Sequence, residues 1–139
     1  MNARAIDLAY AAGIIDGEGC VSICDASFYG REVYQLRVAV QMTNPEAIRV
    51  LYELFGGRLY YVLKTEKRKA RDSWMVFNSQ AATTLRELMP YLKVKQYIAL
   101  AALRADWPKP HGRGLSIGQQ EIRREVFAIL KDLNMRGPR

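Results

Sequence analysis

Residues 11–19 read Ala-Ala-Gly-Ile-Ile-Asp-Gly-Glu-Gly, and this stretch says more about the fold than any other part of the chain. An apolar helical run of small residues ends there in two carboxylates, Asp16 and Glu18, which alternate with glycines. The C-terminus of a helix carries partial negative charge, which disfavours acids unless a positive group joins them. Gly17 and Gly19 are expected to let the backbone turn sharply and expose carbonyl oxygens. Because carboxylate and carbonyl oxygens are the ligands that Mg²⁺ prefers, the stretch predicts a metal site at a helix end.

The composition is that of a single basic globular domain spanning residues 1–139. Half of the residues are hydrophobic, which argues against a disordered chain and allows a sizeable core. The formal net charge of +7 favours a polyanionic partner, although a merely basic surface would give the same value. No stretch approaches the ~20 apolar residues of a membrane span, and no secretory leader pattern opens the chain. We therefore expect a soluble intracellular protein without a membrane partner.

The cysteines and the histidine do not predict a zinc site or a disulfide. Cys20 and Cys24 would lie ~13 Å apart on one strand, too far for a disulfide, so both are expected to be reduced. A closed zinc site lacks ligands because His111 is the one histidine of the chain. His111 lies in a stretch rich in Pro and Gly and is interpreted as a loop residue, with a DNA contact as the alternative.

The sequence pattern predicts an ordered series of helices and strands. Asp7 is a plausible N-cap for the first helix, and Asn44-Pro45 is typical of a helix start. Alternation of apolar and polar residues over 35–43 is that of a half-buried antiparallel strand. The expected elements are a helix over 6–16, strands over 20–28 and 35–43, a helix from 45 to the glycines at 56–57, strands over 58–65 and 73–78, helices over 80–89 and 94–103, and a last helix opened by a capping box at 116–119.

Residues 11–19 resemble the nonapeptide signature of the LAGLIDADG homing endonucleases. The residues that fit its positions directly are Ala12, Gly13, Ile15, Asp16 and Gly19. Ile14 is a conservative exchange, and Glu18 keeps the second acid. Ala11 departs from the usual Leu, and Gly17 stands where Ala is usual. The resemblance implies an α+β fold of order αββαββα with a saddle-shaped antiparallel sheet. The predicted elements follow this order over about 6–105, and the helix at about 116–134 is interpreted as a C-terminal addition.

The first helix is expected to carry a dimer interface. Ala9, Ala12 and Gly13 lie on one smooth face of small residues, which would let two helix backbones approach closely. Since the chain has one copy of the motif, the resemblance implies a homodimer through this helix, with two Glu18 carboxylates side by side. Packing of the same face against the chain's own sheet is the alternative.

The polar faces of the four strands predict a platform for the major groove of double-stranded DNA. The candidate base-reading residues are Ser22, Cys24, Gln35, Arg37, Gln41, Arg58 and Tyr60. For any one of them, an ordinary solvated sheet face is the alternative. The basic stretch between the last two strands would contact phosphates and supply salt-sensitive affinity. Its cations are Lys64, Lys67, Arg68, Lys69 and Arg71.

Three residues are assigned to catalysis. Glu18, with the carbonyl of Gly17, is predicted to bind Mg²⁺ at the dimer axis, with Mn²⁺ or Ca²⁺ able to replace it for binding. The resemblance matches Lys95 with a lysine near the scissile phosphate, the alternative being a solvated lysine at a helix start. It also matches Asn44 with a polar residue that holds water, the alternative being a helix cap. Asp16 is interpreted as structural.

The resemblance implies a site-specific, metal-dependent DNA endonuclease. Such a homodimer would make a double-strand break in a long, nearly palindromic site, each subunit cutting one strand, and would promote the mobility of an intron. A protein of the same fold that binds nucleic acid without cutting it, such as an intron-splicing maturase or a transcription regulator, is the main alternative. The acid at position 18 favours cleavage, because a protein that only binds has no evident need for it.

Overall fold

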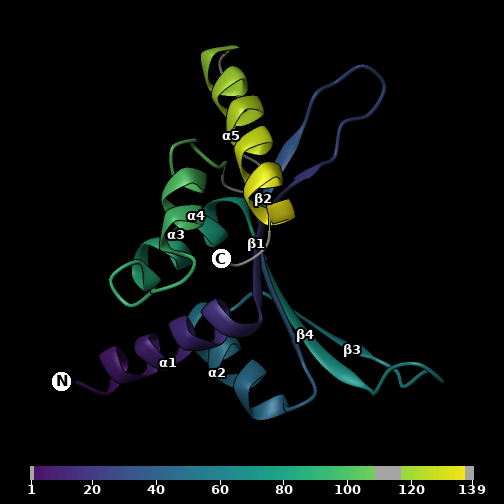
Figure 1. The fold of residues 1–139 in the computed structure, drawn as a ribbon, viewed down its shortest axis with the longest axis vertical. Coiled ribbons are helices and arrows are strands. Elements are labelled where there is room, and N and C mark those ends of the chain that lie inside the picture. The colour runs from purple at the N-terminus through teal and green to yellow at the C-terminus, as the bar shows by residue number, and fades with distance from the viewer. Residues whose placement is uncertain (1, 109–116, 137–139) are drawn as a thin grey trace.

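The computed structural model describes residues 2–108 and 117–136, and it consists of a four-stranded antiparallel sheet covered by helices on one face (Figure 1). The elements in chain order are α1 (Ala3–Glu18), β1 (Gly19–Asp25), β2 (Tyr34–Met42), α2 (Pro45–Phe55), β3 (Arg58–Val62), β4 (Arg71–Phe77), α3 (Asn78–Leu88), α4 (Gln96–Ala102) and α5 (Ile117–Arg136). The α+β class and the order αββαββα are therefore confirmed.

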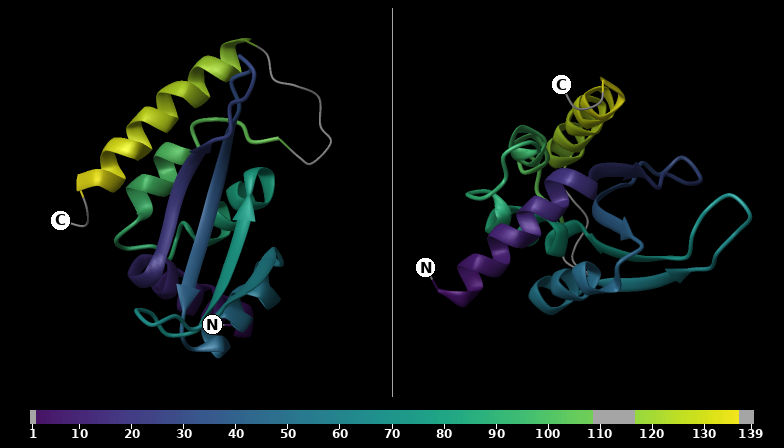
Figure 2. Two further views of the ribbon diagram at one scale, coloured as in Figure 1. Left: turned by 90° about the vertical axis from the view of Figure 1, so that its right-hand side faces the viewer. Right: turned by 60° about the horizontal axis from the view of Figure 1, so that its bottom comes forward.

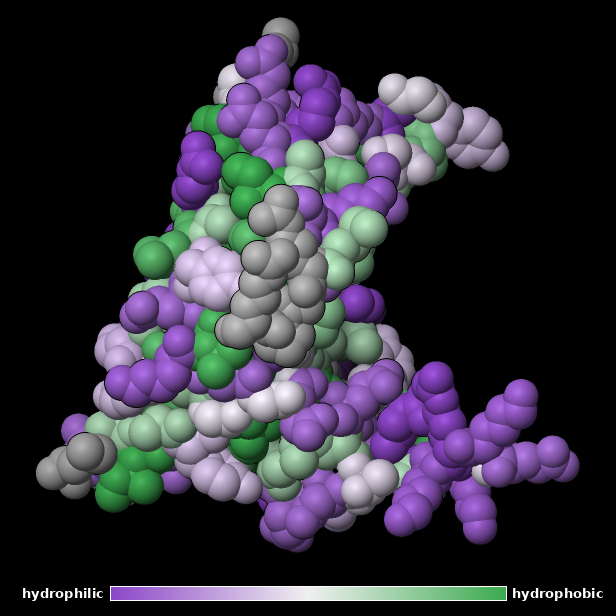
Figure 3. Space-filling model, in the orientation of Figure 1, coloured by the Kyte–Doolittle hydropathy of each residue, from purple (hydrophilic) through white to green (hydrophobic). Residues whose placement is uncertain are grey.

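The strands lie in the order β1-β2-β4-β3, so β3 and β1 form the edges of the sheet. Gly19 pairs with Val40, and Met42 pairs with Asp72. The end of α1 therefore lies beside the end of β2 and the start of β4. Figure 2 shows that the helices gather on one side of the sheet, whereas the opposite face is open. In Figure 3 this open side is hollowed between two projecting hairpins.

The core lies between the sheet and the helices, as the alternating pattern of β2 predicts. Leu36, Val38 and Val40 are buried, and the residues between them are partly exposed on the opposite face. Trp74 of β4 is fully buried, and its indole N–H donates a hydrogen bond to the carbonyl of Gly56 at 2.7 Å. The sheet thus keeps an apolar face for the core and a polar face for solvent or a ligand.

Several boundaries differ from those expected. Helix α1 begins at Ala3, because the side chain of Asn2 accepts a hydrogen bond from the amide of Ala5, so Asp7 was wrong as the N-cap. Strand β1 ends at residue 25 instead of 28 because a separate tight turn follows it. Strand β3 ends at residue 62 and β4 begins at residue 71, which makes the hairpin between them longer than expected.

The glycines at positions 17 and 19 do not form the sharp turn that was expected. Gly17 lies within α1, and Gly19 is extended, with φ −83° and ψ 158°. A Cβ atom on Gly19 would lie 2.7 Å from the carbonyl oxygen of Ile15, which is inside any normal contact distance. Glycine at position 19 is therefore explained by the close approach of β1 to the last turn of α1.

Helix α5 packs on the β1–β2 part of the sheet. Val126 and Leu130 are almost completely buried, and the side-chain amide of Asn134 donates a hydrogen bond to the carbonyl of Val21 at 3.0 Å. The aromatic rings of Tyr34 and Phe127 lie 5.1 Å apart. The expected capping box at 116–119 begins outside the described residues, and His111 also lies outside them.

Candidate nucleic-acid interface and metal site

The two acids of the motif have different surroundings at the end of α1. The carboxylate of Asp16 accepts hydrogen bonds from the backbone amides of Lys93 at 2.8 Å and Lys95 at 2.9 Å. Both of its oxygens therefore hold the segment before α4. Glu18 is the last residue of α1 and is exposed. Glu18 is consequently the motif carboxylate that is open to a ligand.

The positive group at this helix end is Lys95. Its ammonium donates hydrogen bonds to the carbonyl oxygens of Ile15 and Asp16, both at 2.9 Å. A cation that binds the last carbonyls of a helix offsets the partial negative charge there. Lys95 is half-buried, and its ammonium contacts α1 two and three residues before Glu18, so it is neither a solvated surface lysine nor remote from the motif.

Asn44 lies at the same end of the sheet, after the last residue of β2. Its side-chain oxygen accepts a hydrogen bond from the amide of Glu46 at 2.9 Å, so it is the N-cap of α2. The side chain is exposed. The structure thus shows the capping role and leaves the side-chain amide accessible to a further ligand.

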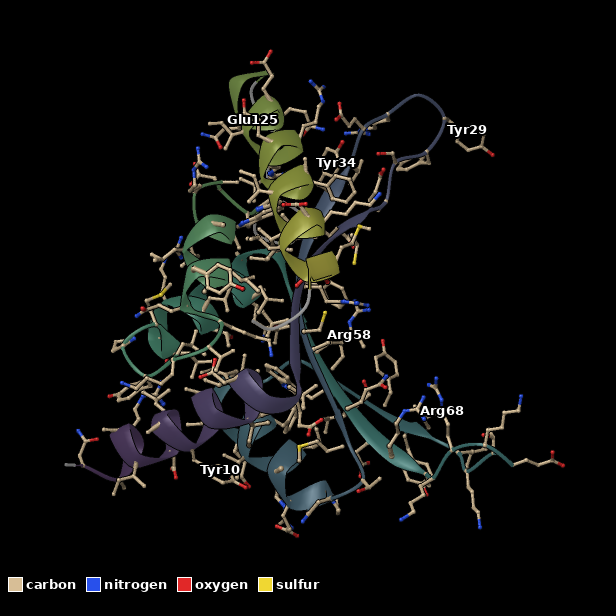
Figure 4. All side chains as sticks on the ribbon, viewed as in Figure 1. Tyr10, Tyr29, Tyr34, Arg58, Arg68 and Glu125 are labelled. Carbon is tan, nitrogen blue, oxygen red and sulfur yellow. The ribbon has the colours of Figure 1, made fainter. Side chains whose placement is uncertain are left out.

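The open face of the sheet brings the candidate base-reading residues together. Ser22 lies opposite Arg37, and Cys24 lies opposite Gln35, on the β1–β2 pair. Gln41 accepts a hydrogen bond from the side chain of Arg71 at 3.0 Å. Both cysteines are free thiols, as expected. Figure 4 places Arg58 at the hollow between the two hairpins. Polar residues of all four strands thus form one continuous face.

Some polar atoms of this face are buried without a hydrogen-bond partner. They are the hydroxyl oxygens of Ser22 and Ser73 and the Nε of Arg37. Buried polar atoms are nearly always paired in folded proteins, so these groups call for a ligand or water. Sequence reasoning missed Ser73, which faces Gln41 and Tyr60 in the sheet. Residues 74–77 are all apolar, so the sequence pattern does not show which of them share a face with Ser73.

The hairpin between β3 and β4 carries the cations expected to contact phosphates. Lys64, Lys67, Arg68 and Lys69 are exposed, and Arg71 is partly buried at the start of β4. A turn in which the carbonyl of Arg68 accepts a hydrogen bond from the amide of Thr65 holds the tip. Figure 3 shows this hairpin as a hydrophilic projection at the lower right, beyond the hollow.

Several solved protein structures have the same architecture as this chain. No family model and no curated protein matches the sequence. The homing endonuclease I-CvuI, in complex with its target in the presence of 2 mM Ca, is 19% identical, covers 91% of this chain and 95% of its own, and has a TM-score of 0.62. The archaeal intron-encoded homing endonuclease I-Vdi141I, complexed with DNA, is 17% identical and covers 93% of this chain and 84% of its own, with a TM-score of 0.64. The LAGLIDADG meganuclease I-AabMI, bound to uncleaved DNA, is 14% identical over 70% of this chain and 35% of its own, with a TM-score of 0.52.

The chain has the LAGLIDADG homing endonuclease fold. The motif helix of this fold is α1, which presents an exposed face in this chain. Ala9 and Gly13 are on that face, and a Cβ atom on Gly13 would meet no heavy atom within 4 Å. Ala12 must be removed from the expected interface, because it is fully buried against the chain's own core. Ile6 and Tyr10, each more than half exposed, take its place on the face.

A single copy of this LAGLIDADG fold offers few ligands for a metal ion. Within residues 2–108 and 117–136, no three His, Cys, Asp or Glu side chains come close enough to hold one. Glu18 and the backbone at Gly17 fit a magnesium ion that takes its other ligands from water, phosphate or a second copy, since Mg²⁺ is commonly held by one or two carboxylates. No described helix is long and apolar enough to cross a membrane.

Proposed function

We propose that this chain is a LAGLIDADG homing endonuclease: a homodimeric, site-specific enzyme that uses a divalent metal ion to cut both strands of a long, nearly palindromic DNA site. Cleavage of such a site would promote the mobility of the intron that encodes the protein. The observation that carries the proposal is the exposed carboxylate of Glu18 at the end of α1, where the ammonium of Lys95 binds the carbonyls of Ile15 and Asp16. This helix end lies at one end of a polar sheet face with unpartnered groups.

The proposed dimer brings two copies of this helix end together. The exposed face formed by Ile6, Ala9, Tyr10 and Gly13 would pack on the same face of a second copy around a two-fold axis. The small residues Ala9 and Gly13 allow the two backbones to approach, while the larger side chains bury apolar area. Two Glu18 carboxylates near the axis would repel each other unless a cation lies between or beside them.

The residues at the helix end would have separate roles in phosphodiester hydrolysis. A bound Mg²⁺ would neutralise charge on the phosphate and activate a water molecule. Lys95 uses two of its three N–H donors on α1 carbonyls, which leaves one donor for a phosphate oxygen that gains negative charge during attack. Asn44, exposed at the end of β2, would orient water while it caps α2.

The open sheet face would lie in the major groove, and the β3–β4 hairpin would bind the phosphate backbone. Arg37 and Ser22 lie opposite each other on this face, and paired hydrogen bonds from Arg to guanine are the commonest specific contact. The exposed lysines of the hairpin add affinity that depends on salt and little on sequence.

The test separates binding from cleavage. The wild type selects its site from a pool of random-sequence duplexes, and the selected duplex is then used with Glu18→Gln and with Glu53→Gln, the same change on an exposed carboxylate of α2. We expect Glu18→Gln to bind with nearly unchanged affinity and to lose cleavage in Mg²⁺, and Glu53→Gln to keep both. Unimpaired cleavage by Glu18→Gln would refute the catalytic assignment. A wild type that binds but does not cut would favour a maturase or a regulator.

A further inference from the structure

The turn between β1 and β2 is strained at an aromatic residue. Tyr29 and Gly30 have positive φ angles of 46° and 76°. The amide of Phe28 donates to the carbonyl of Arg31 at 3.0 Å, and the amide of Arg31 donates to the carbonyl of Phe28 at 2.8 Å. This is a two-residue hairpin turn with both central residues at positive φ, where Asn-Gly is the favoured pair. A tyrosine at the first of these positions costs backbone strain.

Packing of the Tyr29 ring against the rest of the chain does not offset this strain. Its relative exposure is 103%, and its aromatic contact is with Phe28 of the same turn, at a centroid distance of 6.3 Å. Phe28 is itself more than half exposed. An exposed apolar tip held in a disfavoured conformation adds nothing to the core, so the tip points to a contact outside the chain.

Helix α5 holds the base of the β1–β2 hairpin, which we call the arm and which carries Tyr29 at its tip. The carboxylate of Glu32 pairs with the guanidinium of Arg124 at 2.6 and 2.7 Å, and the side chain of Gln120 donates to the carbonyl of Glu32 at 2.6 Å. Tyr34 stacks near Phe127, as described above. These contacts restrict the base of the arm, so the position of Tyr29 relative to the sheet is well defined.

The arm projects on the same side of the molecule as the basic hairpin. Figure 4 shows Tyr29 at the tip of one hairpin and Arg68 on the other, and the two hairpins flank the hollow where Arg58 lies. The chain runs extended from Gly19 along β1, so Tyr29 lies at most about 33 Å from the end of α1. One turn of B-DNA is about 34 Å, so the tip would reach base pairs roughly one helical turn from the centre of the site.

We propose that Tyr29, with Phe28, is a specificity-determining contact that packs against thymine methyl groups in the major groove near the outer end of each half-site. This inference rests on the proposed function. The polar sheet face and this tip form one continuous side of the molecule, and the thymine methyl is the apolar group that the major groove offers. Arg31 at the same turn is exposed and suits a neighbouring phosphate.

The test compares Tyr29→Asn with Tyr61→Asn. Asn adopts positive φ more readily than Tyr, so Tyr29→Asn keeps the turn, and Tyr61 is an exposed tyrosine of β3 whose neighbours along the strand, not itself, face the hollow. Each protein selects sites from random-sequence duplexes. We expect Tyr29→Asn to lose about tenfold of the preference for thymine at outer positions on both sides of the site, with an unchanged or higher melting temperature, and Tyr61→Asn to select the wild-type site.

A second experiment tests the thymine methyl group itself. Uracil replaces thymine at those outer positions, which deletes the methyl and leaves base pairing intact. We expect weaker binding by the wild type and unchanged binding by Tyr29→Asn. Identical preferences for the wild type and Tyr29→Asn, a lowered melting temperature of Tyr29→Asn, or an equal effect of uracil on both proteins would overturn this inference alone. A wild type that selects no site would overturn the proposed function and this inference together.

Discussion

The side chains of Asp16 and Lys95 bind each other's backbone across 79 residues of sequence: the carboxylate of Asp16 accepts the amide of Lys95, and the ammonium of Lys95 donates to the carbonyl of Asp16. This reciprocal pair joins the motif helix α1 to the start of α4. Because Asp16 is engaged in this way, Glu18 is the acid of residues 11–19 whose side chain is left exposed.

Replacement of Lys95 by Met tests both roles of the ammonium. It should lower the free energy of unfolding by about 1 kcal/mol, since the last carbonyls of α1 lose a charged partner. It should also lower cleavage by roughly a hundredfold, since a donor to the reacting phosphate is lost. Urea unfolding and cleavage rates measure the two effects. Lys93→Met is the control, because Lys93 contacts Asp16 through its backbone amide and its side chain is exposed. Equal effects of the two variants would contradict the assignment.

Alanine substitutions at two neighbouring glycines should have opposite effects on stability. Gly19→Ala places a Cβ atom 2.7 Å from the carbonyl oxygen of Ile15 and should lower the free energy of unfolding by about 1–3 kcal/mol. Gly17→Ala adds a methyl group within α1 where no heavy atom lies within 4 Å, and should raise stability by up to about 1 kcal/mol. Thermal or urea unfolding gives both values, and a stable Gly19→Ala would show that the close approach is unimportant.

The exposed face of α1 can be tested for self-association. Gly13→Leu should weaken the proposed dimer at least tenfold, because the new side chain would separate two closely packed helices. Gly118→Leu is the control, since Gly118 lies in α5 and also has no heavy atom within 4 Å of a built Cβ. Sedimentation equilibrium measures the dissociation constants. An unchanged constant for Gly13→Leu would remove α1 from the interface.

The pair between Glu32 and Arg124 should make stability depend on acid pH. The hydrogen bonds from Arg124 and Tyr34 lower the pKa of Glu32 from 4.5 to about 2. A carboxyl group whose pKa is lower in the folded state stabilises the fold above its unfolded pKa, and this stabilisation is lost as the pH falls from about 4.5 to about 2. Wild-type stability should therefore decline more steeply over this range than that of Glu32→Gln. Parallel curves in urea unfolding at several pH values would contradict the contribution of the pair.

The β3–β4 hairpin should control the salt dependence of DNA binding. A triple variant with Lys67, Arg68 and Lys69 changed to Gln should bind more weakly, and the slope of log affinity against log salt should fall by roughly 0.9 for each lost phosphate contact. The single change Arg86→Gln, on an exposed cation of α3 in the helical layer, should leave the slope unchanged. A triple variant with the wild-type slope would place the phosphate contacts elsewhere.

The sequence predicts best those elements whose signals are local. The alternation of residues 35–43 identified β2 because a half-buried strand requires a period of two, and Asn44-Pro45 marked the start of α2 because the cap acts on an amide two residues away. The ends of β1 and β3 were misplaced, since the turns after them have their own hydrogen bonds and geometry.

The candidate site depends on contacts between distant residues, which a single sequence does not show. A stripe of small residues does not reveal which side of a helix faces the core, so Ala12 was placed on the wrong side of α1. The tendency of a helix end to attract a positive group was readable from residues 11–19. That Lys95 supplies this group depends on the fold, which brings the segment before α4 to the end of α1.

We propose that Glu18 holds a cation at a two-fold axis against DNA. The most direct measurement is a crystal structure of the protein with its selected duplex in the presence of Ca²⁺, which supports binding while slowing hydrolysis. We expect two protomers joined through α1, with a Ca²⁺ ion about 2.3–2.6 Å from a Glu18 carboxylate oxygen and from a phosphate oxygen. A helix end without an ion, with Glu18 turned away from the DNA backbone, would contradict it.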